Sequence, residues 1–449
     1  MYYMEKKQIP WVPIFLFSTI FIGFISRLYL SLTLPIWHDE AYSIWASTTP
    51  FFRIITGFTD PVHTPGYYLL LKVWSFVSMH LFWMRLNTLL FFLLNTLILY
   101  QLGRKIRNAT YGSLLVFFYI FSGYFLLFDW NVRMYTFIDT CILLSLFFLL
   151  KKQYILFGLI NIVGLYSDYA FLWYFLPLGC IYVFYSFIKN DKEKYIPLKI
   201  IVVDTILFIL LYPNMILFYQ RGIEGIRWME PYWNPAFFIP YFLGSHDVIP
   251  MTVVLWILFI IGGYQVFVKK CPFTIRLILL SAVISLAGTL LSVLTPFKLF
   301  HIRSLQIVPL GFIFCFSECA MNIRTLWKKI ILIFILILFI GNYFTHAYLL
   351  PIQPGKYIIS FFPWKSVIKN LTYENGTTFN ILAHNLPITY LLRWGLMYSL
   401  NGNEVLFSKK YAYKEIQSYT ELTPNCAFVY RGLIDIFSCP SHYSSIGRY

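Results

Sequence analysis

Residues 34–71 read LPIWHDEAYSIWASTTPFFRIITGFTDPVHTPGYYLLL and lie between two long apolar runs. This short connection gathers six ionisable side chains: His38, Asp39, Glu40, Arg53, Asp60 and His63. A loop that only joins two membrane helices needs none of these groups. Ionisable side chains on a loop that a rigid scaffold holds are typical of a reactive or binding site. We therefore expect the connection over residues 34–80 to contain the active site, with the Asp39–Glu40 pair at its centre.

The composition indicates an integral membrane protein. Of the 449 residues, 59% are hydrophobic and only 12% are charged, whereas charged residues make up about a quarter of a soluble chain. The net charge of +16 would suggest nucleic-acid binding in a soluble protein. Here the placement of the basic residues indicates membrane topology instead. We expect membrane lipids as surroundings and no nucleic-acid partner.

Apolar runs long enough to cross the hydrocarbon core recur along the first 350 residues. Arg27, near the far end of the first run, is expected to reach toward the lipid headgroups. The candidate spans, about eleven in number, are 11–33, 81–102, 110–127, 134–150, 154–167, 169–188, 197–218, 250–268, 277–295, 301–319 and 329–350.

The connections between these spans alternate in character. One set is rich in Lys and Arg: residues 104–108, 151–153, 188–195, 269–276 and 322–329. The other set mixes acids and histidines with arginine: residues 34–80, 128–133, 166–170, 219–235 and 295–303. The positive-inside rule places the first set and the N-terminus in the cytoplasm. The second set and the C-terminal part then face the outside of a plasma membrane, or the lumen of the endoplasmic reticulum in a eukaryote.

The chain becomes more polar from residue 351 onward. Three strand-like runs, 379–385, 404–409 and 426–432, alternate with a helical pattern over 387–400, which predicts a small α/β domain. The predicted fold is thus an all-α polytopic membrane domain, residues 1–350, followed by an extracytoplasmic α/β domain, residues 351–449. Whether Cys426 and Cys439 form a disulfide there is left open.

Asp39 and Glu40 follow a span end, so they are expected at the outer membrane interface, before an amphipathic segment over residues 41–56. A carboxylate beside apolar surface can act as general base toward a hydroxyl. The alternative is structural, because acids in the first turn of a helix favour its dipole without any chemistry.

His63 comes just before a helix that is expected to begin at Pro65, with Lys72 about two turns further along. His63 could bind an anion, ligate a metal together with Asp39, or only cap the helix. A metal at this point would be a divalent ion such as Mg, Mn or Zn.

Two further external connections contain candidate residues. In residues 128–139, Arg133 could bind a phosphate through paired hydrogen bonds, and Asp129 and Tyr135 lie beside it in sequence. Asp139 lies deeper in the following span, where an ionisable group usually has a partner or a function. In residues 295–303 three basic side chains oppose the positive-inside bias, which suggests a bound anion such as a lipid phosphate: Lys298, His301 and Arg303.

Together these motifs resemble the N-terminal half of family 39 and related GT-C glycosyltransferases. That group includes protein O-mannosyltransferases, which use dolichyl phosphate mannose, and the lipid A aminoarabinose transferase of the bacterial cell envelope. The resemblance rests on WHDEAYSIWA (37–46), HTPGYYLLLKVW (63–74), NVRMYTFIDTCILLSL (131–146) and GLYSDYAFLWYFLPL (164–178), and more loosely on FHIRSLQIVPLG (300–311).

This resemblance implies inverting transfer of one sugar from a polyprenyl-phosphate donor to a lipid, glycan or protein acceptor outside the cytoplasm. It implies Asp39 as the base, with Glu40 orienting Asp39 or the acceptor. Arg133 and Arg303 would stabilise the departing phosphate, with His63 and Lys72 as weaker candidates.

The sequence departs from the family pattern at three points: Thr64, residues 129–131, and Asp168, where relatives often have histidine. Two alternative functions stay open. One is a lipid-linked sugar flippase or transporter, which buried acids such as Asp139 and Asp204 would suit. The other is a glycan polymerase or ligase of similar architecture.

Overall fold

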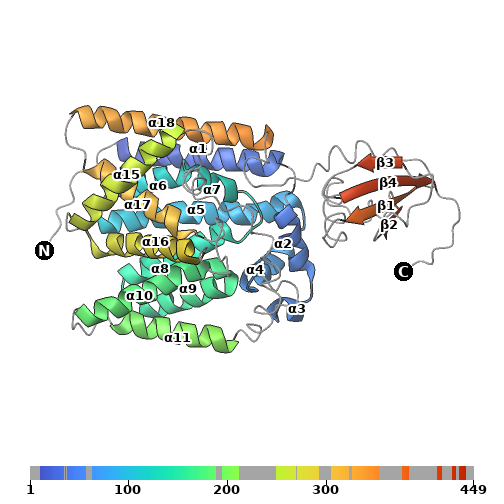
Figure 1. Ribbon diagram of the computed structural model, residues 1–449, viewed down its shortest axis with the longest axis horizontal. Coiled ribbons are helices and arrows are strands. Elements are labelled where there is room, and N and C mark those ends of the chain that lie inside the picture. Colours follow the sequence, from blue (N-terminus) through green and yellow to red (C-terminus); the bar gives the residue numbers. More distant parts are fainter. Residues whose placement is uncertain are drawn as a thin grey trace.

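The computed structural model (Figure 1) describes residues 11–34, 36, 38–56, 63–188, 195–211, 249–268, 271–292, 305–322, 326–352, 377–383, 412–416, 427–430 and 434–440. Up to residue 352 the regular elements among these residues are helices. The helices are α1 (Trp11–Thr33), α2 (His38–Thr48), α3 (Phe51–Ile55), α4 (Gly66–Ser75), α5 (Leu81–Ile106), α6 (Ala109–Ile120), α7 (Gly123–Phe128), α8 (Tyr135–Leu150), α9 (Tyr154–Ser167), the 3-10 helix η1 (Tyr169–Phe171), α10 (Leu172–Ile188), α11 (Tyr195–Leu211), α15 (Ile249–Val268), α16 (Phe273–Ser292), α17 (Ile307–Met321) and α18 (Leu326–Ile352).

The predicted apolar runs correspond closely to these helices. By length and hydropathy, two described helices are able to cross a membrane, α1 and α5, and eight shorter apolar stretches have 10–17 residues. The number of spans therefore stays a prediction. Large apolar side chains at the outer helices are 60–71% exposed, an arrangement that suits hydrocarbon better than water. Examples from α1, α11, α15 and α18 are Phe17, Leu210, Ile260 and Phe334.

The expected single span over 110–127 is two helices, because α6 ends at Ile120 and α7 begins at Gly123. Arg27 lies at this break. Its Nη2 donates to the carbonyl of Ile120 (3.2 Å), and its Nε donates to Asp129 (3.1 Å). The side chain of Arg27 is fully buried. The expectation that Arg27 extends toward lipid headgroups is therefore wrong, since its charge is paired inside the protein.

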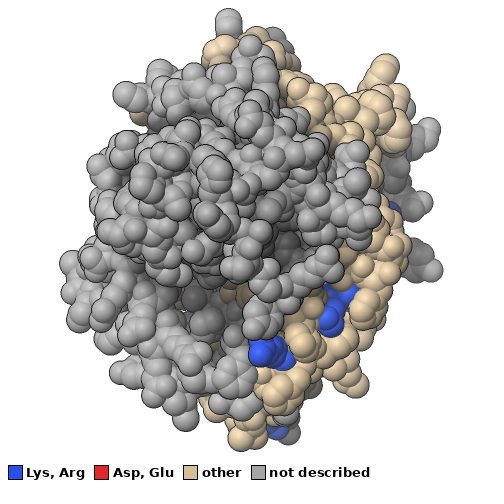
Figure 2. All heavy atoms as spheres, turned by 90° about the vertical axis from the view of Figure 1, so that its right-hand side faces the viewer, with Lys and Arg blue, Asp and Glu red and all other residues tan. Residues whose placement is uncertain are grey.

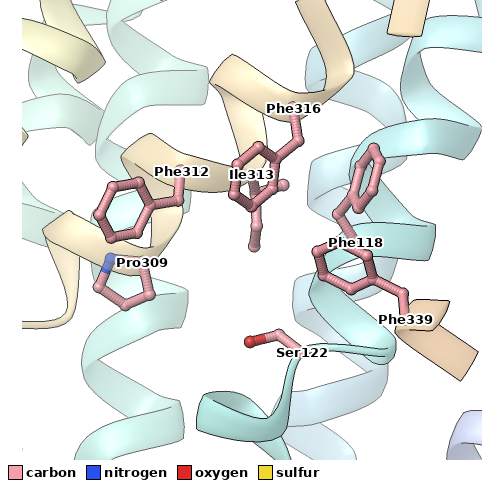
Figure 3. Close-up of a pocket in the computed structure, with 7 residues that line it drawn as sticks. All are labelled: Phe118, Ser122, Pro309, Phe312, Ile313, Phe316 and Phe339. Carbon is pink, nitrogen blue, oxygen red and sulfur yellow. The ribbon is translucent and has the colours of Figure 1, made fainter. Parts of the chain in front are cut away.

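Aromatic side chains fill the space between α6, α17 and α18 (Figure 3). Phe118, Phe316 and Phe339 lie with ring centroids 5.2–5.8 Å apart, and a cavity of about 10 Å³ separates them from Ser122. That volume is about the size of one water molecule. The cavity is therefore a packing gap and not a substrate site.

A chain of polar side chains joins four helices within the apolar region. The Ser145 hydroxyl lies 2.8 Å from the Tyr174 hydroxyl and donates to Asn161 (2.7 Å). Asn161 in turn donates to Asp204 (3.2 Å). Because α8, α9, α10 and α11 each contribute one member, these hydrogen bonds fasten the helices together where apolar packing alone is less specific.

The two ends of α5 contact different sets of connections. Over 26 residues α5 spans about 39 Å. At its first end Arg85 pairs with Glu40, and beyond its last residue Arg107 pairs with Glu318 (2.6 Å). Among the described connections, residues of 34–80 and 128–133 thus meet at one end of α5, and Arg107 meets Glu318 at the other. Which end faces the cytoplasm stays a prediction.

The C-terminal part contains a four-stranded sheet, drawn at the right of Figure 1. Its strands are β1 (Thr377–Ala383), β2 (Ala412–Ile416), β3 (Ala427–Tyr430) and β4 (Ile434–Pro440), in the order β2-β1-β4-β3. Strand β1 pairs parallel to β2 and antiparallel to β4. The predicted runs at 379–385 and 426–432 overlap β1 and β3, whereas β2 and β4 were not expected. The run at 404–409, the helix over 387–400 and Cys426 lie outside the described residues.

Candidate functional site

The Asp39–Glu40 pair lies in the first turn of α2, as the sequence suggested. The two carboxylates differ in their surroundings: Asp39 is partly exposed, whereas Glu40 is fully buried. The predicted amphipathic segment is two helices, α2 and α3, separated by Pro50. Of the pair, Asp39 is the residue that keeps some exposed surface.

Glu40 is held by Arg85 of α5. Arg85 donates to both carboxylate oxygens through Nε (2.9 Å) and Nη2 (2.7 Å), and the Val132 amide donates to Oε1 (2.9 Å). Arg85 Nη1 also donates to the carbonyls of Ser31 and Leu34, each at 2.8 Å. The pair therefore joins the end of α1, the start of α2, α5 and the loop before α8. Its role in the geometry is to fix the first turn of α2.

Arg133 lies against the same turn of α2. Its Nη1 donates to the Ser43 hydroxyl (3.0 Å) and to the backbone carbonyl of Asp39 (3.4 Å). Its Nη2 lies 3.1 Å from Nε2 of His63, and its guanidinium carbon lies 5.8 Å from the centre of the Tyr135 ring. Only 5% of Arg133 is exposed. A buried positive charge thus lies within hydrogen-bond distance of the backbone of Asp39.

His63 joins Arg133 to Asp168. Its Nδ1 lies 2.7 Å from Oδ2 of Asp168, whose Oδ1 accepts from the Ala170 amide (2.6 Å) and caps η1. Gly66 makes this approach possible, because a Cβ at that position would lie 2.6 Å from the carbonyl oxygen of Tyr166. The close packing of α4 on the end of α9 therefore sets the position of His63 relative to Asp168.

The structure thus brings together four predicted residues from three connections: Asp39, His63, Arg133 and Asp168. Sequence analysis missed two participants, Ser43 and Arg85. Ser43 follows Asp39 by one helical turn and offered no signal of its own. Arg85 did offer one, because an arginine inside an apolar helix requires a buried partner.

Three other predicted residues lie elsewhere. Lys72 donates to the carbonyls of Ser47 (3.3 Å) and Thr49 (2.7 Å), at the opposite end of α2 from Asp39. Asp129 pairs with Arg27, and burial outweighs that ion pair, which raises the pKa of the carboxyl to about 6. Asp139 is buried in α8, and its Oδ1 has no hydrogen-bond partner among the described residues.

The remaining basic candidates, Lys298, His301 and Arg303, lie outside the described residues. Figure 2 views the end of the molecule at the right of Figure 1. Basic side chains are visible there at the edge of the described surface, and acidic ones are not visible among the described atoms in this view.

The described residues do not fit the metal site that Asp39 and His63 could have formed. Within the described ranges, three or more His, Cys, Asp or Glu side chains are nowhere grouped to hold a metal. Both ring nitrogens of His63 already have partners, Asp168 and Arg133. We therefore derive no step through a metal.

Comparison of the sequence with protein-family profiles and with curated proteins finds no match. The structure is nevertheless similar to that of ArnT from Cupriavidus metallidurans bound to undecaprenyl phosphate, with a TM-score of 0.59 and 11% identity over 95% of this chain and 98% of that one. Apo ArnT gives a TM-score of 0.55 and 12% identity over 95% and 97% of the two chains. These likenesses establish the fold, which is the mostly helical fold of ArnT.

Proposed function

We propose that this protein is an inverting GT-C glycosyltransferase that moves one sugar from a polyprenyl-phosphate donor to a lipid, glycan or protein acceptor outside the cytoplasm. The observation that supports this most directly is the contact between Arg133 and the first turn of α2. It puts a guanidinium, suited to phosphate, against the helix turn that carries the partly exposed Asp39, whose carboxylate is suited to a hydroxyl proton. A polyprenyl phosphate bound to ArnT gives the donor class independent support.

In the proposed reaction the acceptor oxygen attacks the anomeric carbon while the bond from that carbon to the phosphate oxygen breaks. The acceptor proton passes to the Asp39 carboxylate, and the polyprenyl phosphate leaves with the bonding electrons. A single displacement of this kind inverts the anomeric centre. Glu40 acts indirectly, because its pair with Arg85 holds the helix turn that presents Asp39.

Charge on the departing phosphate grows as the sugar takes on oxocarbenium character. Arg133 stabilises that charge in a largely buried setting, where electrostatic interactions are stronger than in water. We also propose that three further basic side chains bind the phosphate: Lys298, His301 and Arg303. The aromatic ring of Tyr135 lies beside the Arg133 guanidinium.

The test uses purified full-length protein in lipid nanodiscs with undecaprenyl-phosphate sugars and a membrane extract as the acceptor source. We expect transfer by the wild type, and none by Asp39→Asn, which keeps its affinity for undecaprenyl phosphate. Arg133→Gln is expected to lose both. Equal rates of sugar transfer by Asp39→Asn and the wild type would show that Asp39 is not the base.

A lipid-linked sugar flippase is the second candidate, and the buried Asp139 is the observation that favours it. The same protein in sealed vesicles separates the two. Movement of the donor across the bilayer without any transfer would support the flippase. Transfer of a preassembled glycan block in place of one sugar would support a ligase or polymerase.

A further inference from the structure

We infer that Asp168 and His63 are positioning residues that orient the Arg133 guanidinium. In this arrangement Asp168 holds a neutral His63 in the tautomer with its hydrogen on Nδ1, so that the lone pair on Nε2 accepts a hydrogen bond from Arg133. The inference rests on the proposed function only for what Arg133 then binds. It gives His63 an indirect role in place of direct contact with the donor phosphate.

The direction of each hydrogen bond follows from donor chemistry. Arginine has five N–H donors, has no acceptor and stays protonated in proteins. His63 Nε2, 3.1 Å from Arg133 Nη2, must therefore be the acceptor. A neutral imidazole has one N–H and one lone pair, so the hydrogen lies on Nδ1. That hydrogen faces Asp168 Oδ2 at 2.7 Å, where a carboxylate oxygen accepts it.

Asp168 is itself held by a second bond. Its Oδ1 accepts from the Ala170 amide at 2.6 Å, so each of its two oxygens has a separate partner. Asp168 is 4% exposed, whereas the His63 side chain is 24% exposed. The carboxylate is therefore the buried and fixed end of the arrangement, and the imidazole takes its orientation from it.

The other end of the arrangement is α2. Arg133 Nη1 donates to the Ser43 hydroxyl and the Asp39 carbonyl while Nη2 contacts His63. A planar guanidinium held through two nitrogens cannot rotate without breaking one set of bonds. His63 and Asp168, which lie 105 residues apart in the chain, thus together determine where the positive charge lies relative to the backbone of Asp39.

The substitution Asp168→Asn tests this without changing side-chain shape. One oxygen becomes an NH₂ group, and if the other keeps its bond to the Ala170 amide, the NH₂ faces Nδ1 of His63. Nδ1 must then accept, its hydrogen moves to Nε2, and that hydrogen points at Arg133. Replacement of an aspartate by asparagine behind a histidine is known to select the wrong tautomer in this way.

The experiment measures ¹⁵N NMR spectra of histidine-labelled full-length protein in nanodiscs. The chain has eight histidines, and His63→Gln identifies the His63 signals by their loss. We expect the Nδ1–H tautomer in the wild type and the Nε2–H tautomer in Asp168→Asn. The Kd for undecaprenyl phosphate should rise roughly tenfold or more in that variant, since a hydrogen bond to a charged group is lost.

Asp204→Asn serves as the matched control, because it changes a buried carboxylate outside this arrangement and should leave both readouts unchanged. An Nε2–H tautomer in the wild type would overturn the inference even if Asp168→Asn does not fold. So would an unchanged tautomer or an unchanged Kd in Asp168→Asn. Absence of sugar transfer by the wild type would count against the proposed function alone, because the tautomer is measured independently.

Discussion

Glu40 and Arg85 form a two-bond ion pair in which neither side chain is exposed. The pair connects residues 45 positions apart, and Arg85 also donates hydrogen bonds to carbonyls at the end of α1. Breaking such a pair leaves a charge buried without compensation, although the intact pair adds little net stability. Its main effect is to fix the start of α2, and with it the position of the neighbouring Asp39.

Glu40 and Asp39 should therefore respond differently to substitution. We expect Glu40→Ala to lower the free energy of unfolding by about 3–5 kcal/mol, because the Arg85 charge remains buried. Asp39→Asn should leave stability nearly unchanged, since Asp39 is partly exposed. Thermal unfolding midpoints in detergent measure both. Equal midpoints for the two variants would contradict a structural role for Glu40.

Lys72 should matter for stability and not for donor binding. Its ammonium donates to carbonyls at the C-terminal end of α2, a position where a cation favours the helix dipole. We expect Lys72→Gln to cost about 1 kcal/mol while the Kd for undecaprenyl phosphate stays that of the wild type. Lys72→Arg, which keeps the charge, is the control. A tenfold rise of that Kd in Lys72→Gln, but not in Lys72→Arg, would show that the charge of Lys72 contributes to phosphate binding.

Asp129 predicts a pH dependence of stability. Burial raises its pKa from 3.8 to about 6, so the folded state binds the proton more tightly than the unfolded state does. The stability that protonation of Asp129 contributes is fully present below pH 3.8, and it is lost as the pH rises through about 6. The stability of the wild type relative to Asp129→Asn should therefore fall between about pH 4 and pH 6 and then level off. A flat difference across this range, in unfolding midpoints measured at each pH, would show that the pKa is unshifted.

Much of the helical architecture was predictable because lipid and a packed interior both select apolar runs. The expected runs over 134–150 and 154–167 match α8 and α9 to within one residue. The break between α6 and α7 was not predictable from hydropathy, because both sides of it are equally apolar. At this break Arg27 of α1 donates a hydrogen bond to the carbonyl of Ile120, a contact between segments far apart in the sequence.

The sequence pointed to residues that the structure brings together, but not to their pairings. Asp39, His63 and Arg133 were candidates because ionisable groups in predicted external connections are costly next to a membrane and usually have a partner or a function. That His63 meets Asp168, and that Glu40 is occupied by Arg85, depends on contacts between segments far apart in sequence. Hydrophobic periodicity holds no information about such contacts.

Two of the acids buried in the helical part, Asp139 and Asp204, offer a test between enzyme and flippase. Asp204 accepts from Asn161, an interaction that an asparagine oxygen can also make, so Asp204→Asn should keep its transfer rate. Asp139→Asn is expected to keep it too, because Asp139 lies outside the Asp39–Arg133 contacts. Rates of sugar transfer and of donor movement across sealed vesicles, measured on the same preparations, check this. Loss of donor movement in either variant would favour proton-coupled transport.

Gly66 should be the most sensitive glycine for the site. A Cβ there would lie 2.6 Å from the Tyr166 carbonyl oxygen and 3.0 Å from the Ser167 hydroxyl, so Gly66→Ala forces α4 away from α9. We expect a loss of roughly 1–3 kcal/mol of stability and a rise in the Kd for undecaprenyl phosphate as His63 moves away from Asp168.

Gly341→Ala in α18 is the matched control, because a Cβ there meets nothing within 4 Å. In the middle of a helix that change should be neutral or stabilising by up to about 1 kcal/mol. Unaltered donor affinity in a folded Gly66→Ala protein would show that the closeness of α4 and α9 does not control the position of Arg133.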